Sequence, residues 1–92
     1  MVSMSIHSYA SSGNLEGLID SLKDTDVNVT NPFGWTALHI ACWKGHYDIV
    51  NRLINEPGVT INVKDNRGRS PRDVAVSNRH PSIVILLSSF AV

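Results

Sequence analysis

The chain has 92 residues, of which 42% are hydrophobic and 17% charged, and its formal net charge is zero. This composition is typical of one folded domain rather than of a disordered segment. Its longest apolar run, residues 83–87, is far shorter than the ~20 residues of a membrane-spanning helix, and its first residues lack the pattern of a signal peptide. The only cysteine is Cys42, so no internal disulfide can form. We therefore expect an intracellular protein, cytoplasmic or nuclear.

The charges are unevenly distributed along the chain. Residues 1–63 contain three basic and six acidic side chains, whereas residues 64–92 contain five basic and two acidic ones. The basic excess at the C-terminal end could attract an acidic partner. Five dispersed basic residues without interleaved aromatic residues are not typical of a nucleic-acid-binding surface. We expect neither a nucleic-acid partner nor a membrane partner.

The first part of the chain, about residues 1–30, contains a degenerate copy of a repeat. Its apolar and turn residues realign with clearer counterparts 32 residues later. The matching residues are Ile6, His7, Gly13, Asn14, Leu18 and Leu22. Residues 27–31 then alternate apolar and polar side chains, which predicts an extended finger closed by a turn at Gly34.

The central part, about residues 31–64, is the clearest copy and predicts two short helices. Thr36 is a good N-cap for the first helix, and Gly45 can adopt the positive φ that ends it. Apolar residues at helical spacing predict the buried side of each helix. For the first helix these are Leu38, Ala41 and Cys42, and for the second Ile49, Val50, Leu53 and Ile54.

The last part, about residues 65–92, realigns with the central copy at an offset of 34 residues. Residues 61–65 predict a second finger, closed by a turn at Gly68. Arg72 and Asp73 stand where the central copy has Leu38 and His39. Asn78 and Arg79 stand where it has a glycine turn, so this copy departs from the pattern as terminal repeats often do.

The segment Thr36-Ala-Leu-His-Ile-Ala-Cys-Trp-Lys-Gly-His46 closely resembles the ankyrin-repeat signature. The resemblance covers essentially the whole chain and is most specific in residues 26–65; Tyr9 departs from it by replacing a small alanine. It implies an all-α fold, an ankyrin-repeat solenoid of stacked antiparallel helix pairs with β-hairpin fingers. We expect one domain, residues 1–92, with repeats at about 1–30, 31–64 and 65–92. The family implies protein binding through fingers and first helices rather than catalysis.

Several residues of the central copy occupy positions that the family pattern leaves variable. Exposed Trp and Phe side chains supply rigid apolar area to interfaces, so an aromatic cluster here predicts a binding site. The alternative is that Trp35 packs against its own hairpin. Three closely spaced arginines, Arg67, Arg69 and Arg72, could clamp a carboxylate or phosphate, or could simply be solvated. The candidate partner-binding residues are Phe33, Trp35, Trp43, Lys44, Arg67 and Arg69, and Pro32 and Arg72 lie beside them.

His39, Cys42 and His46 are residue types that bind zinc or form a nucleophile pair. Gly45 interrupts the helical face that would carry them. In the family pattern, histidines at these two positions are expected to hydrogen-bond the backbone of neighbouring turns, and a buried thiol has a raised pKa and is inert. We therefore expect no metal site, no cofactor and no catalytic residue.

Residues 82–92 contain no charge, and their apolar side chains cannot all lie on one face of a helix. A terminal repeat needs a polar outer surface to remain soluble alone. This segment is therefore a possible contact site, through Ile85, Leu86, Phe90 and Val92. Two functions follow. The first is an adaptor or regulator that binds a protein partner, and the second is a structural subunit, or a fragment of a longer protein, with its last helix buried against other chains.

Overall fold

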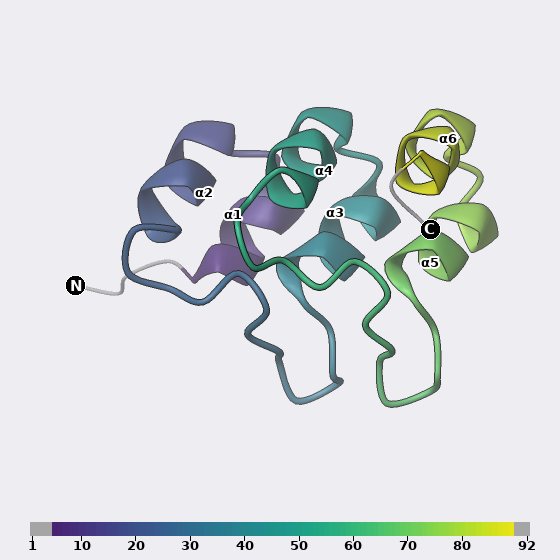
Figure 1. The fold of residues 1–92 in the computed structure, drawn as a ribbon, viewed down its shortest axis with the longest axis horizontal. Coiled ribbons are helices and arrows are strands. Elements are labelled where there is room, and N and C mark those ends of the chain that lie inside the picture. Colours follow the sequence, from purple (N-terminus) through teal and green to yellow (C-terminus); the bar gives the residue numbers. More distant parts are fainter. Residues whose placement is uncertain (1–4, 90–92) are drawn as a thin grey trace.

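A computed structural model describes residues 5–89, which form six short α-helices and no strand (Figure 1). In chain order the helices are α1 (Ile6–Ser12), α2 (Leu15–Ser21), α3 (Ala37–Lys44), α4 (Tyr47–Ile54), α5 (Pro71–Ser77) and α6 (Pro81–Ser88). Consecutive helices pair, and the three pairs stack side by side with α1, α3 and α5 in one layer and α2, α4 and α6 in the other. Within the described range, no helix has the length and hydrophobicity needed to cross a membrane.

The helix ends follow from local sequence. Thr36 caps α3 with its side chain and forms a reciprocal capping box with His39, and Ser70 does the same for α5 with Asp73. Gly13 and Gly45 end α1 and α3 with φ values of 76° and 78°, which confirms the predicted stop at Gly45. The third pair lacks this glycine, and Arg79 itself takes a φ of 60°.

The core lies between the two layers and between neighbouring pairs. Small side chains, Ala10, Ala41 and Ala75, have no exposed surface, and they let α3 approach α1 on one side and α5 on the other. All seven apolar residues predicted to face inward in the central copy are buried. They are Leu38, Ala41, Cys42, Ile49, Val50, Leu53 and Ile54.

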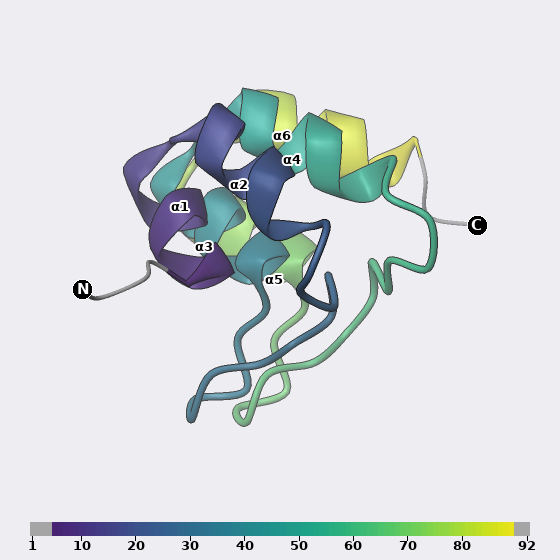
Figure 2. The same cartoon turned by 90° about the vertical axis from the view of Figure 1, so that its left-hand side faces the viewer.

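The two fingers, residues 26–36 and 60–70, project from the layer of α1, α3 and α5 (Figure 2). The predicted β-hairpins are not present in them, because each finger is a loop closed at its tip by side-chain hydrogen bonds. The Asn31 carboxamide oxygen accepts from the backbone N–H groups of Phe33 and Trp35, both at 3.0 Å. Asp65 closes the second finger in the same way. Two further backbone bonds span each tip. In the first finger the Asn31 N–H donates to the Trp35 carbonyl and the Gly34 N–H to the Asn31 carbonyl, and in the second finger Asp65, Arg69 and Gly68 form the same two bonds.

The fingers are also bonded to one another. At the tips, the Asn66 backbone N–H donates to the Phe33 carbonyl at 3.2 Å, and the Asn66 side chain donates to the Pro32 carbonyl at 3.0 Å. Nearer the helices, the Asn28 side chain donates to the Gly58 carbonyl and accepts from the Thr60 N–H. The two fingers are therefore fixed relative to each other by contacts between repeats.

The large Tyr9 side chain fits because the residue facing it on α2, Gly17, has no side chain. A Cβ atom added at Gly17 would lie 2.4 Å from the Tyr9 ring. In the central pair the corresponding positions hold Ala41 and Ile49, both buried, so large and small residues exchange places between the two layers. In the first pair the large side chain therefore lies on the first helix and the small residue on the second helix, whereas the central pair has the small residue on its first helix.

We predict that Gly17→Ala destabilises the domain by about 1–3 kcal/mol, because the added methyl overpacks the space that the Tyr9 ring fills. Tyr9→Ala should also destabilise, by leaving a cavity. The double variant Tyr9→Ala with Gly17→Ile copies the arrangement of the central pair and should recover much of the loss. Urea unfolding of the wild-type chain, Tyr9→Ala, Gly17→Ile and the double variant measures this coupling; strictly additive effects of the two substitutions would show that the two positions do not share one space.

Candidate functional site

A groove of about 450 Å³ lies between the two fingers and the side of α3. Five of the six candidate partner-binding residues line it, namely Phe33, Trp35, Trp43, Arg67 and Arg69. The sixth, Lys44, follows Trp43 at the end of α3, and its ammonium lies 4.3 Å from the centre of the Trp43 ring. Residues that the sequence did not single out complete the lining, among them Ile40, Asp65 and Asn66.

Trp35 is a partly buried wall of the groove. Its indole N–H donates to the Asp65 carboxylate at 2.8 Å, and its ring stacks on His39 with centroids 6.0 Å apart. The Arg69 guanidinium lies 5.6 Å from the Trp35 ring centre. Trp35 therefore packs against α3 and the second finger.

Trp43 and Phe33 are the exposed aromatic side chains of the groove. Trp43 meets Trp35 edge to face, with ring centroids 5.5 Å apart and an interplanar angle of 78°. Its side of α3 faces the groove, and 43% of the residue stays exposed. Phe33, at the tip of the first finger, is 72% exposed. Exposed aromatic area held on a rigid framework is typical of binding surfaces.

Asp65 is the residue that joins the groove to the fold. Its carboxylate accepts four hydrogen bonds, from the backbone N–H groups of Arg67 and Arg69, from the Trp35 indole and from the Arg69 side chain. Burial alone would raise the pKa of Asp65, but these four donors outweigh it and hold the pKa well below its usual range. The alignment of Asp65 with Asn31 could have revealed the turn, but nothing in the sequence indicated the bond to Trp35.

The basic residues of the second finger divide into two kinds. Arg69 forms an ion pair with Asp65 at 3.0 Å, so its charge is balanced. Arg67 is exposed, and no acidic side chain among residues 5–89 lies within ion-pair distance of it. Arg72 is not part of the same cluster, because its side chain donates to Ser88 on α6. The structure therefore brings together two of the three arginines considered as a clamp.

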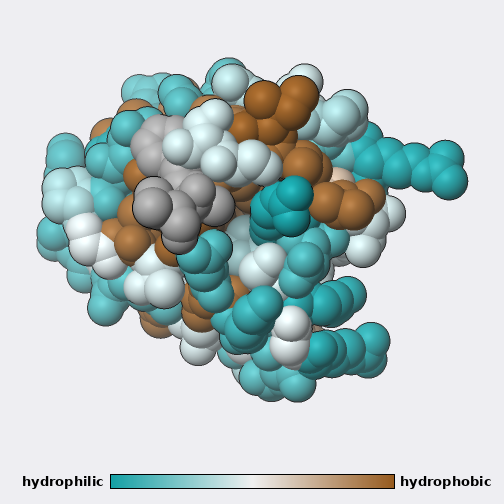
Figure 3. Space-filling view, turned by 45° about the vertical axis from the view of Figure 1, so that its right-hand side comes forward, coloured by the Kyte–Doolittle hydropathy of each residue, from teal (hydrophilic) through white to brown (hydrophobic). Residues whose placement is uncertain are grey.

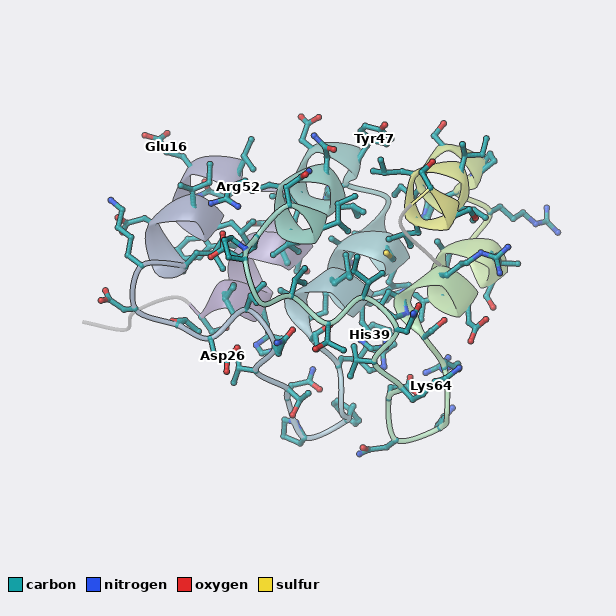
Figure 4. All side chains as sticks on the ribbon, viewed as in Figure 1. Glu16, Asp26, His39, Tyr47, Arg52 and Lys64 are labelled. Atoms are coloured by element: carbon teal, nitrogen blue, oxygen red, sulfur yellow. The ribbon has the colours of Figure 1, made fainter. Side chains whose placement is uncertain are left out.

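His39 and His46 bond to different neighbouring repeats, and Cys42 is buried in the core (Figure 4 labels His39, where α3 meets the fingers). The His39 Nε2–H donates to the Arg69 carbonyl at 2.9 Å, and the His46 Nε2–H donates to the Ser11 carbonyl at 3.0 Å. These bonds to neighbouring repeats confirm the expected role of both histidines. Burial lowers the pKa of His39 and raises the pKa of the Cys42 thiol to about 12. Residues 5–89 contain no group of three side chains placed to hold a metal ion.

The candidate C-terminal contact residues are only partly described. Ile85 on α6 is 69% exposed, whereas Leu86 packs partly against the core. Phe90 and Val92 lie outside the described residues. A second hollow, of about 600 Å³, lies beside α6 and is lined by Tyr47, His80 and Ile85 among others.

We predict that the Asp65 carboxylate makes folding stability depend on acid. Because its pKa is lower in the folded chain than in the unfolded chain, its stabilisation is complete above about pH 4 and is lost as the pH falls below that value. Asp65→Asn should remove part of this loss and cost about 2 kcal/mol at neutral pH. Some dependence should remain, because hydrogen bonds from Ser70 lower the pKa of Asp73 too. Thermal unfolding between pH 2 and 7 tests this, with the exposed Asp24→Asn as the matched control.

We predict that the Cys42 thiol does not react with a disulfide reagent in the folded chain. The residue has no exposed surface, and burial keeps it in the protonated form. Labelling should therefore proceed only as fast as the domain opens, and should become rapid in urea. Ser12→Cys in a Cys42→Ala chain places a thiol at an exposed position and supplies the fast reference. Equal labelling rates for the two chains would contradict the buried position of Cys42.

The comparisons with known proteins agree with this arrangement. A family model for ankyrin repeats in three copies matches residues 6–91. The human ankyrin repeat domain-containing protein SOWAHB is 31% identical over 91 residues, which cover 91% of this chain and 12% of that protein. The tyrosine-protein kinase HTK16 of Hydra vulgaris is 40% identical over 74 residues, which cover 80% of this chain and 10% of the kinase.

A putative ankyrin repeat protein of Rickettsia bellii is 42% identical over 55 residues, covering 60% of this chain and 57% of that protein. The chain thus spans about a tenth of the first two relatives, and the likeness is to their ankyrin regions. The chain therefore belongs to the ankyrin-repeat family, since the family model matches residues 6–91 and the structure has three stacked helix pairs with bonded fingers.

Proposed function

We propose that this chain is a protein-binding adaptor or regulator that holds its partner in the groove between the fingers and α3. Ankyrin repeats generally mediate contacts between proteins, and in this chain the groove carries exposed aromatic side chains, Trp43 and Phe33. The observation that carries the proposal is the exposure of Trp43, 43% of which is open to solvent beside the 450 Å³ groove. Tryptophan is enriched among the residues that dominate binding energy.

The groove is preorganised, which supports a binding role. Its wall residue Trp35 is held by Asp65, and its two fingers are bonded through Asn66 and Asn28. A surface that is already ordered loses little conformational entropy when a partner binds. Ordering the groove then offsets little of the free energy gained by covering Trp43 and Phe33.

We further propose that the chain has no enzymatic activity and works inside the cell. The one thiol is buried, with a raised pKa, and His39 and His46 are engaged with backbone carbonyls. None of the three is free to act as a nucleophile or a base at a surface. The proposed organisation is a single domain over residues 1–92, with repeats at about 1–30, 31–64 and 65–92.

We predict that Trp43→Ala weakens the affinity for a partner captured from the native cell by about tenfold or more, which corresponds to at least ~1.4 kcal/mol. The matched control is Tyr47→Ala, which removes an aromatic side chain of similar exposure, 45%, from α4. Isothermal titration calorimetry of both variants measures the difference. A partner that loses affinity with Tyr47→Ala and not with Trp43→Ala would place the binding site elsewhere.

A second candidate function is that of a structural subunit, with the last helix pair buried against another chain. The observation that favours it is Val76, which is 53% exposed. The corresponding residues of the first two pairs, Ala10 and Cys42, are fully buried by the pair that follows them. Together with Ile85 on α6, Val76 leaves apolar surface on the last pair, and Figure 3 shows hydrophobic side chains gathered where that end of the stack comes forward.

We predict that, if this second function holds, the purified chain self-associates as its concentration rises. Val76→Glu and Ile85→Glu would each place a charge in the contact and shift the chain toward the monomer. Light scattering after size exclusion measures the mass directly. The control is Ile19→Glu, which alters an exposed apolar residue, 38% exposed, at the opposite end of the stack. A monomer at every concentration favours the adaptor over the structural role.

A further inference from the structure

The charges around the groove are not balanced. Asp65 and Arg69 neutralise each other as an ion pair at 3.0 Å. Arg67 lines the groove and Lys44 lies beside Trp43 at its edge, and neither has an acidic side chain within ion-pair distance in the part of the chain that the structure describes. The groove is therefore positive, although the chain as a whole is neutral.

The aromatic rings of the groove already hold cations of this chain. The Arg69 guanidinium lies 5.6 Å from the Trp35 ring centre, and the Lys44 ammonium lies 4.3 Å from that of Trp43. A basic ligand would have to displace these cations from the rings and would be repelled by Arg67. The arrangement thus disfavours basic ligand segments and favours acidic ones.

The floor and rim of the groove are apolar. Ile40 is 7% exposed at the floor, and Trp43 and Phe33 stand exposed on two sides. The volume of about 450 Å³ is within the range of roughly 300–1,000 Å³ that is typical of ligand pockets, which is enough room for a large side chain. A ligand without a bulky apolar group would leave this area uncovered.

From these observations, and resting on the proposed function, we infer that the groove binds an acidic peptide segment that carries a bulky apolar side chain. The apolar side chain packs against Trp43 and Phe33. Carboxylates on either side of it pair with Arg67 and with Lys44. Such charge complementarity determines which partner is accepted and how fast it associates, and the apolar contact supplies most of the affinity.

Single-stranded nucleic acid is the other polymer that combines negative charge with flat apolar groups, since its bases stack on aromatic side chains. The structure favours the peptide. Nucleic-acid binding uses a positive track that follows a run of phosphates, whereas the cations without an acidic neighbour that border this groove are Arg67 and Lys44. An oligothymidylate is therefore included in the test as a competing probe.

The test is a displayed library of random linear peptides, selected on the whole 92-residue chain and counter-selected on its Trp43→Ala variant. Enriched peptides are then synthesised and titrated against the wild-type chain, Arg67→Glu, Lys44→Glu and the control Arg79→Glu, whose charge lies away from the groove. We expect enriched peptides to place Asp or Glu next to Leu, Met, Phe or Trp. Arg67→Glu should weaken their binding about tenfold or more, added salt should weaken it as well, and Arg79→Glu should not.

The other outcomes separate this inference from the proposed function. Peptides that need Trp43 but are basic or uncharged, or acidic peptides that bind Arg67→Glu as well as the wild-type chain, would overturn the acidic ligand and leave the proposed binding surface intact. Tighter binding of oligothymidylate than of any enriched peptide would overturn the peptide as ligand. Failure to enrich any peptide over the Trp43→Ala chain would count against both. Circular dichroism and thermal unfolding confirm that each variant is folded.

Discussion

The structure depends on contact between neighbouring helix pairs, because no element of this chain is stable by itself. The longest helices have eight residues, well below the length at which an isolated helix persists in water. Small side chains at Ala10, Ala41 and Ala75 let the first helices approach closely, and the second helices then cover the remaining apolar surface. The groove is a product of the same stacking, since its two fingers belong to different repeats and are ordered only while those repeats are in contact.

Histidines repeat one kind of bond along the stack. The Nε2 atoms of His46 and His80 each donate to a backbone carbonyl at the end of the preceding first helix, at Ser11 and at Trp43. His39 reaches forward instead, to the Arg69 carbonyl on the second finger. All three of these bonds end on residues that line the groove, so the positions of the groove side chains are set by the same links that hold the repeats together. This coupling explains how a small domain can present a rigid surface on loops.

The sequence predicted what is determined locally and missed what is determined across repeats. Caps such as Thr36 and Gly45 and the apolar spacing of α4 are local signals, and the structure confirms them. The alternating residues of the fingers indicated hairpins, but alternation does not specify a partner strand, and side chains such as Asn31 close the loops instead. The bond from Trp35 to Asp65 joins residues 30 positions apart, so no pattern in either segment could reveal it.

The fold and the proposed binding depend on different members of one cluster. Trp35 and Asp65 are buried or partly buried and are bonded to each other, so any change in them alters the fold together with the groove. Trp43, Phe33 and Arg67 are exposed, and the side chain of none of them donates or accepts a hydrogen bond within residues 5–89. Exposed aromatic side chains add nothing to the core and favour aggregation, so stability does not explain their presence. The binding role proposed above would account for it, because these three residues are the part of the cluster that a partner can cover.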